Sequence, residues 1–162
     1  MPHVELSITD FGPVTPPPTP RQVPGVAKSD GATSGTTAMD PLDHWVRAVA
    51  GAVEPCMVID AGGVIVAMSP ACVELMGLGA SPVGAELRKG PLRLIDFSGD
   101  GGKLSETEVG KIPPLLAVSS GRLARGLIRV RVGETPVTLD AIATPIGVVG
   151  AVAGSLTFFS PV

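Results

Sequence analysis

The 162-residue sequence predicts an α+β domain, in which a five-stranded antiparallel sheet follows an amphipathic helix and carries its other helices mainly on one face. Two patterns predict this class. After Pro41 the apolar residues recur at helical spacing, whereas after Gly121 they alternate with polar residues at the period of a half-buried strand. The length allows one modest domain with a tail, which excludes a large multidomain enzyme.

The net charge and the two cysteines argue against nucleic-acid binding, a metal site and a disulfide framework. A net charge of -3 provides no basic surface of the kind that binds nucleic acid. Cys56 and Cys72 have no metal-ligand spacing and are too few for a disulfide framework, which suits a reducing compartment. The acidic start of the chain does not resemble an export signal. We therefore expect a cytoplasmic protein without a metal site and without direct nucleic-acid contacts.

Residues 1–38 are rich in Pro, Thr, Ser and Gly. Such a composition buries too little apolar surface to compensate for the entropy lost on ordering. We expect a disordered arm at residues 1–38, acting as a spacer rather than as a proline-rich docking motif, and a folded domain at residues 39–162.

A helix is predicted at residues 41–53. Asp40 is suited to cap its first turn, Pro41 is favoured at the first helical position, and Pro55 prevents its continuation. The apolar stripe of this helix consists of Leu42, Trp45, Val46, Val49 and Val53.

Two short apolar runs at residues 56–60 and 64–68 flank Ala61-Gly62-Gly63, which predicts a tight hairpin. A Ser-Pro pair then starts a short helix at residues 71–76, which Gly77 ends.

The middle of the chain is loop-rich. Ser105 and Glu108 have the spacing of a capping box, and a helix is predicted from the Pro113-Pro114 pair to Gly121.

Two strands follow, and their alternation predicts a register with a four-residue loop at residues 133–136. On the polar face this register places Arg129 opposite Asp140, which predicts an ion pair. On the apolar face it pairs Val132 with Val137, Val130 with Leu139, and Ile128 with Ala141.

The uncharged stretch 141–162 is long enough to raise the alternative of a membrane span. Pro145 and three glycines interrupt it, so a turn followed by a strand at residues 148–159 is favoured. The nearly continuous apolar run predicts a central strand that is covered on both faces. The helix that contains Trp45 is the expected cover, from the same chain or from a second copy.

Three short segments resemble the opening of PAS domains: residues 58–66, 69–71 and 74–77. In that family an Asp, a Gly three residues later and an apolar strand precede Asn-Pro and a helix that ends in Leu-x-Gly. Residues 82–84, 92–95 and 149–152 are similar to the middle and end of the family. Ser69 stands where the family commonly has Asn, so we expect the helix cap to be weaker or differently bonded.

The resemblance implies a sensor or interaction module, whose interior can hold a cofactor, a small molecule or nothing. His3 and His44 do not lie where the haem ligand of the family does, and Cys72 does not match its flavin-reactive cysteine, so we expect no cofactor. A small apolar ligand is an alternative to a filled core. Its lining would be Val58, Leu75, Leu115, Ile128, Val130 and Leu139.

Catalysis is not expected, because the only two histidines are N-terminal and no nucleophile has an evident partner. The glycine-rich loop at residues 98–102 lacks the Lys-Ser/Thr of a phosphate-binding loop. Four arginines are interpreted as lying on a solvated strand face: Arg122, Arg125, Arg129 and Arg131. The alternative is that they bind an anionic partner.

The sequence therefore predicts a non-catalytic signalling module that acts by protein–protein interaction, in signal transduction or transcriptional regulation. Its expected partners are an unknown signalling protein and a second copy, bound through Trp45, Val46 and Val49 and through the outer face of the sheet. A small-molecule receptor is the first alternative, and an enzyme is the least favoured one.

Overall fold

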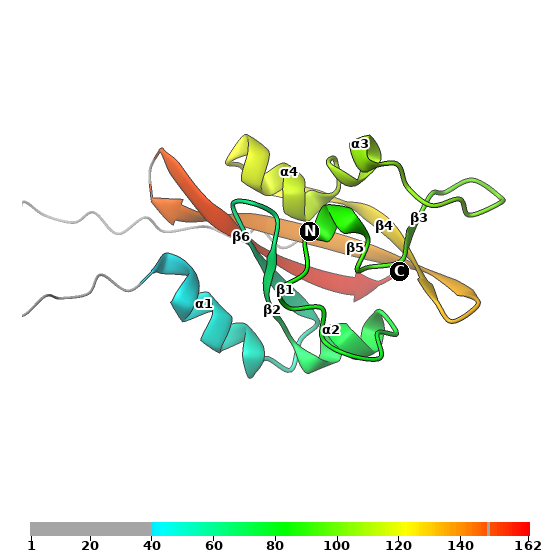
Figure 1. The fold of residues 1–162 in the computed structure, drawn as a ribbon, viewed down its shortest axis with the longest axis horizontal. Coiled ribbons are helices and arrows are strands. Elements are labelled where there is room, and N and C mark those ends of the chain that lie inside the picture. Colours follow the sequence, from blue (N-terminus) through cyan, green and yellow to red (C-terminus); the bar gives the residue numbers. More distant parts are fainter. Residues whose placement is uncertain (1–39, 149) are drawn as a thin grey trace, which may run out of the picture. The chain divides into compact units, whose positions relative to one another are not determined.

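A computed structural model describes residues 40–148 and 150–162, so the arm expected at residues 1–38 lies outside the described residues. Within these ranges the chain forms one antiparallel sheet in the order β2-β1-β6-β5-β4-β3 (Figure 1). The predicted α+β class is confirmed, with six strands in place of five. The elements are α1 (Pro41–Ala50), β1 (Cys56–Asp60), β2 (Ile65–Met68), α2 (Pro70–Leu75), the 3₁₀ helix η1 (Leu87–Lys89), β3 (Leu94–Ile95), α3 (Glu106–Val109), α4 (Pro113–Ser120), β4 (Ala124–Val132), β5 (Thr135–Val148) and β6 (Ala151–Pro161).

Helix α1 begins as predicted. The Asp40 carboxylate accepts a hydrogen bond from the Leu42 amide at 3.0 Å, which satisfies one of the free donors of the first turn. The helix ends at Ala50, earlier than the predicted end at Val53. Gly51 caps it, because glycine has little helical propensity and its amide bonds to the Val49 carbonyl.

The hairpin between β1 and β2 is confirmed. The Asp60 carboxylate accepts a hydrogen bond from the Val64 amide at 2.9 Å, and the Asp60 carbonyl accepts one from the Gly63 amide at 3.0 Å. Gly63 has φ 84°, a conformation that residues with a side chain resist. A Cβ atom at this position would also lie 3.0 Å from Leu115. The turn therefore requires glycine for its backbone and for its close approach to α4.

Ser69 caps α2 and is bonded differently from an ordinary N-cap, as expected. Its hydroxyl accepts hydrogen bonds from the amides of Cys72, at 3.2 Å, and of Cys56, at 3.0 Å. It donates one to the Glu54 carbonyl at 2.8 Å, and the residue is fully buried. One hydroxyl thus joins the start of α2 to the start of β1.

The later helices follow their predicted signals. The capping box of Ser105 and Glu108 is present at the start of α3, and the Pro113-Pro114 pair opens α4. Gly121 ends α4 with φ 64° in the left-handed conformation.

The predicted register between β4 and β5 is wrong by two residues. Val132 lies opposite Thr135, so a two-residue turn replaces the four-residue loop. The short turn is favoured because its twist matches that of the strands, and Gly133 provides a positive φ of 59°. A shift of two residues keeps the side-chain period, so the apolar set still lies on the predicted face. The polar partners change, and Arg129 lies opposite Thr138.

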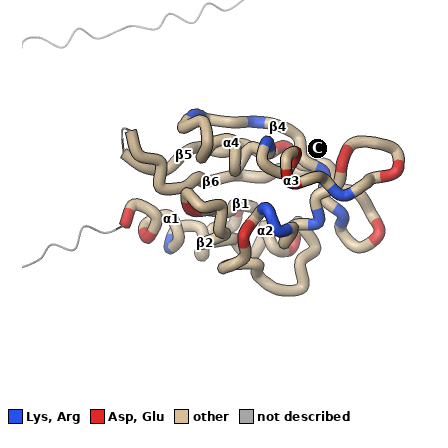
Figure 2. The backbone as a smooth tube through the Cα atoms, turned by 45° about the horizontal axis from the view of Figure 1, so that its top comes forward, with Lys and Arg blue, Asp and Glu red and all other residues tan. Residues whose placement is uncertain are grey.

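Strand β6 is confirmed as a central strand, paired with β1 on one side and β5 on the other. The turn expected before residue 148 does not form there, and β5 continues through Val148. Pro145 is tolerated there because it lies beyond Ala143, the last residue of β5 that pairs with β4. Strand β6 carries no charged residue and β5 carries only Asp140 (Figure 2). No helix in the described ranges is long and apolar enough to cross a membrane.

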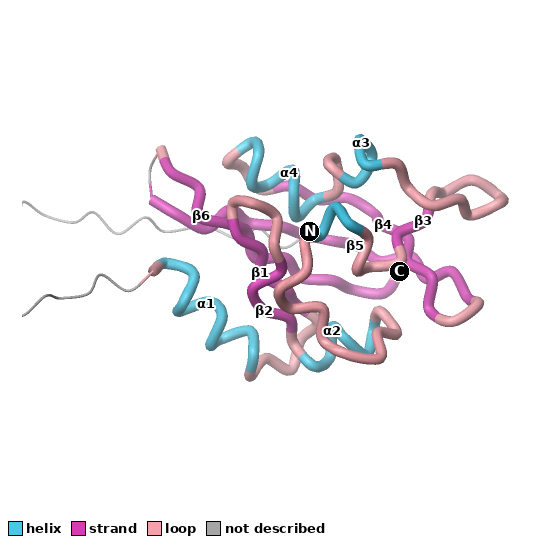
Figure 3. Tube along the Cα trace, in the orientation of Figure 1, coloured by secondary structure: helices cyan, strands magenta, loops and turns pink. Residues whose placement is uncertain are grey.

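Helices α1 and α4 lie on opposite sides of the sheet (Figure 3), which separates the two larger hydrophobic clusters. On its inner face, residues of β1, β4, β5 and β6 pack against α2, η1, α3 and α4, which confirms that the helices lie mainly on one face. On its outer face, α1 of the same chain covers β1, β2 and parts of β5 and β6. The cover of the central strand therefore comes from its own chain.

Candidate functional site

The residues predicted to line a ligand pocket divide between the two faces of the sheet. Leu115, Ile128, Val130 and Leu139 are at most 3% exposed and belong to the inner cluster. Leu75 packs against that cluster, whereas Val58 belongs to the outer one. The structure thus brings five of the six together and separates Val58, because neighbouring residues of a strand point to opposite faces.

Two hydroxyl groups on the inner face of β6 differ in their bonding. The Ser155 hydroxyl donates a hydrogen bond to the Pro114 carbonyl at 2.9 Å, which connects the strand to the first turn of α4. The Thr157 hydroxyl is buried and has no hydrogen-bond partner among the described residues. An unpaired buried hydroxyl costs free energy, so Thr157 differs from Ser155 in being a buried polar position without a partner.

Both cysteines are buried free thiols. Burial, with a smaller contribution from Cys56, raises the pKa of Cys72 to about 12. Burial also raises the pKa of Cys56, although the hydrogen bond with Ser69 opposes the shift. Because the thiolate is the nucleophile and the redox-active form, these thiols are poorly suited to redox or covalent chemistry at neutral pH.

Helix α1 covers one half of the outer face. Leu42, Val46 and Val49 pack on β1, β2, β5 and β6, and Val49 is only 3% exposed. Trp45 lies beside this contact and is 37% exposed, with an edge-to-face contact to His44. Of the three residues predicted for a dimer contact, Trp45 is therefore the one with substantial free surface.

The other half of the outer face is an exposed apolar surface. Phe158 of β6, Ile142 of β5 and Leu127 of β4 are 46%, 37% and 53% exposed. Phe158 is paired with Ile142, and Leu127 is paired with Asp140, two residues from Ile142 on the same face. The register thus makes these three side chains neighbours, and we call them the open outer patch.

An ion pair lies within the open outer patch, between Leu127 and Ile142, and it corrects the predicted partner of Asp140. Arg125 Nε lies 3.1 Å from both carboxylate oxygens of Asp140, and Arg125 Nη2 lies 2.6 Å from Oδ2. The hydrogen bonds and charge of Arg125 lower the pKa of Asp140. The predicted partner, Arg129, instead places its guanidinium 5.1 Å from the ring centroid of Phe97, in cation–π geometry.

The sequence analysis assigned the outer face of the sheet to the dimer contact but named none of the three residues of the open outer patch, although a signal for them exists. Leu127 precedes the buried Ile128, and Phe158 precedes the buried Phe159. Consecutive apolar residues in a strand place apolar surface on both faces, and only one face of β4 and β5 is covered by helices in this region.

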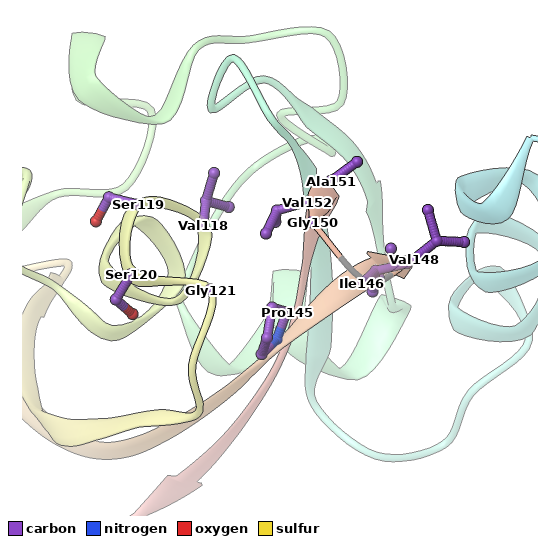
Figure 4. A pocket seen from close by; sticks show the side chains of 11 residues that line it. Val118, Ser119, Ser120, Gly121, Pro145, Ile146, Val148, Gly150, Ala151 and Val152 are labelled. Carbon is purple, nitrogen blue, oxygen red and sulfur yellow. The ribbon is translucent and has the colours of Figure 1, made fainter.

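A hollow of about 490 Å³ lies between the end of α4 and the β5–β6 hairpin (Figure 4). Val118 of α4 and Val152 of β6 face each other across it, with Pro145 below them. None of its lining residues is charged. It therefore lacks groups that could orient a charged ligand, and the described residues contain no cluster of three metal-ligating side chains.

No family model matches the sequence, and no curated protein matches it. Solved structures do match. The PAS domain of a protein from Colwellia psychrerythraea is 20% identical, with a TM-score of 0.50 over 76% of this chain and 98% of that chain. The LOV protein of Rhodobacter sphaeroides is 14% identical, with a TM-score of 0.56 over 75% and 67%. The sensor region of a sensor histidine kinase is 20% identical, with a TM-score of 0.50 over 67% and 38%. The chain has a PAS-like fold, as its sequence motifs predict.

Replacing the unpaired hydroxyl should stabilise the protein. We expect Thr157→Val to raise the free energy of unfolding by about 1 kcal/mol, because the methyl group removes a buried donor without a partner. Ser155→Ala is the matched control on the same strand and should lower it by about 1 kcal/mol, because it leaves the Pro114 carbonyl without its donor. Urea denaturation followed by circular dichroism measures both. A loss of stability in Thr157→Val would show that its hydroxyl is paired.

The buried thiol of Cys72 should make stability depend on pH in the alkaline range. In the unfolded chain the thiol ionises near its ordinary pKa of 9.0, whereas in the folded chain it keeps its proton to about 12. The unfolded state then binds fewer protons, so the free energy of unfolding falls as the pH rises above 9.0, by at most about 1.4 kcal/mol per pH unit. Urea titrations of the wild type and Cys72→Ala measure the difference. Parallel curves would contradict the raised pKa.

Proposed function

We propose that this protein is a sensory signalling module that acts in signal transduction or transcriptional regulation by binding proteins, first of all a second copy of itself. The PAS-like fold supports the sensory role, since one of the similar structures is the sensor region of a sensor histidine kinase. The open outer patch is the observation that carries the proposal. Exposed apolar side chains that gather on three neighbouring strands are typical of an interaction site.

A second copy is the partner that the chemistry of this surface favours. Arg125 and Asp140 neutralise each other, so the open outer patch has no net charge that a partner must match. An apolar surface without net charge can bury itself against its own copy about a two-fold axis. Trp45 adds an aromatic side chain on the same outer face, and aromatic residues are enriched in such contacts.

Val46 and Val49 have a supporting role in this proposal. They pack against the sheet of their own chain and thereby hold α1 on the outer face. The contact that the sequence assigned to Trp45, Val46 and Val49 is therefore proposed to consist of Trp45 together with the open outer patch.

The dimer is tested by placing a charge in the open outer patch. We expect the wild type to be a dimer at high micromolar concentration and Phe158→Glu to be a monomer with an unchanged circular dichroism spectrum, because a buried unpaired carboxylate opposes association. Leu116→Glu is the matched control, since Leu116 is 41% exposed on α4 and should leave the dimer intact. Light scattering after size exclusion measures the mass. A monomeric wild type, or a dimeric and folded Phe158→Glu, would overturn the proposal.

A small-molecule receptor is the second candidate, and Thr157 is the observation that favours it. Its buried hydroxyl points to the inner face, where Ala141, Ala143 and Ala117 are also buried and provide little side-chain volume. A ligand with one hydrogen-bonding group would satisfy the hydroxyl among these short side chains.

Native mass spectrometry tests this candidate. We expect the wild type, purified under mild conditions, to retain a non-covalent mass that Thr157→Val loses, because valine cannot hydrogen-bond the ligand. Ser155→Ala serves as the control and should retain the mass. A wild type with the mass of the bare chain under all mild conditions would exclude the receptor.

A further inference from the structure

A basic hollow of about 340 Å³ lies beside β3, at the edge of the sheet. Leu92, Leu94 and Ile95 line its apolar part but are at most 6% exposed, whereas the positive charge comes from neighbouring basic residues. We call Arg93, Lys103 and Arg131, together with this apolar part, the basic hollow. No carboxylate lines it. The charged side chains that line it are therefore all basic.

Backbone pairing brings the three cations together. The Arg93 carbonyl accepts a hydrogen bond from the Arg131 amide at 2.9 Å, and Lys103 forms a bridge with Ile95. The Arg131 guanidinium also donates to the Gly101 carbonyl at 3.1 Å. The cations therefore come from three segments that are hydrogen-bonded to one another, so their backbone positions are fixed before any ligand binds.

The charges of the basic hollow are not neutralised within the described part of the chain. The ion pairs found there join Lys89 to Glu86 and Arg125 to Asp140, and neither includes a cation of the basic hollow. Three like charges held close together repel one another, and an anionic ligand would relieve that repulsion.

A second hollow, of about 440 Å³, adjoins the first and shares Leu92, Leu94 and Lys103 with it. Arg88 and Lys89 of η1 line it, together with Glu106. The two hollows thus contain five of the ten Lys and Arg residues found from position 40 onward, although the whole chain has a net charge of -3. Figure 2 shows basic positions beside α3 and the end of β4.

We propose that the basic hollow binds an acidic segment of a partner protein. Carboxylates of that segment pair with Arg93, Lys103 and Arg131. The adjoining second hollow extends the surface as an elongated peptide requires. Nucleic acid fits less well, because the net negative charge of the chain repels a long polyanion.

This inference rests on the proposed role as an interaction module and names the chemistry of its second partner, the unknown signalling protein. The basic hollow shares no residue with the open outer patch. Peptide binding and self-association are therefore measured separately, and either proposal can fail while the other stands.

The test uses the full chain and a fluorescein-labelled peptide, Glu-Asp-Leu-Leu-Glu-Asp, in fluorescence anisotropy titrations at about 0.05 M salt. We expect saturable binding that weakens as salt is added, and no binding of a peptide in which Lys replaces every Glu and Asp. Absence of binding by the acidic peptide at low salt would overturn the proposal.

Two double variants locate the site. Arg93→Glu with Lys103→Glu should raise the Kd of the acidic peptide at least about tenfold, because both cations become repulsive. Arg47→Glu with Arg122→Glu makes the same change in net charge at two exposed positions outside the hollows and should change the Kd by less than about twofold. Equal losses in the two double variants would show nonspecific attraction and overturn the site. Tighter binding of oligothymidine or citrate than of the peptide would overturn the assignment to an acidic segment.

Discussion

The pairing of β6 on both of its edges is the constraint on which the rest of the structure depends. β6 bonds to β1 over residues 154–158 and to β5 over residues 151–161, and it is the only link between the β2–β1 hairpin and the β5–β4–β3 side of the described sheet. Its side chains enter both hydrophobic clusters, Phe159 the inner and Leu156 the outer. The absence of charge at residues 154–157 follows directly, since an ionised side chain at these buried positions would lie between a face of the sheet and its helices.

Features fixed by short-range contacts could be predicted from the sequence. Asp40 caps its helix two residues away, Asp60 closes its turn four residues away, and Ser105 and Glu108 bond each other within one turn. In each case the donor and the acceptor are held close by the local chain, so residue type and spacing are enough to identify the contact. The same applies to the central position of β6, because an apolar run of that length needs cover on two faces.

Features that depend on distant segments could not be predicted. The partner of Asp140 changed from Arg129 to Arg125 because the turn between β4 and β5 has two residues instead of four, and the alternation of apolar residues is the same for both registers. Val58 was assigned to the inner face, whereas the pairing of β1 with β6 sets it opposite Leu156 on the outer one. The basic hollow is likewise built from β3, β4 and the loop before α3, whose proximity depends on the sheet order.

Thr157 and Phe158 are consecutive residues of β6, one in the interior beneath the helices and the other in the exposed patch on the opposite face. A rigid tilt or slide of this strand, produced by a change around the hydroxyl, must carry the phenyl ring with it. A change on the inner face of β6 would therefore move the outer face directly. Such coupling needs no chain of side-chain contacts along the sheet and no hinge between domains. In such a design the strand that encloses the interior also carries the surface that is proposed to bind a partner.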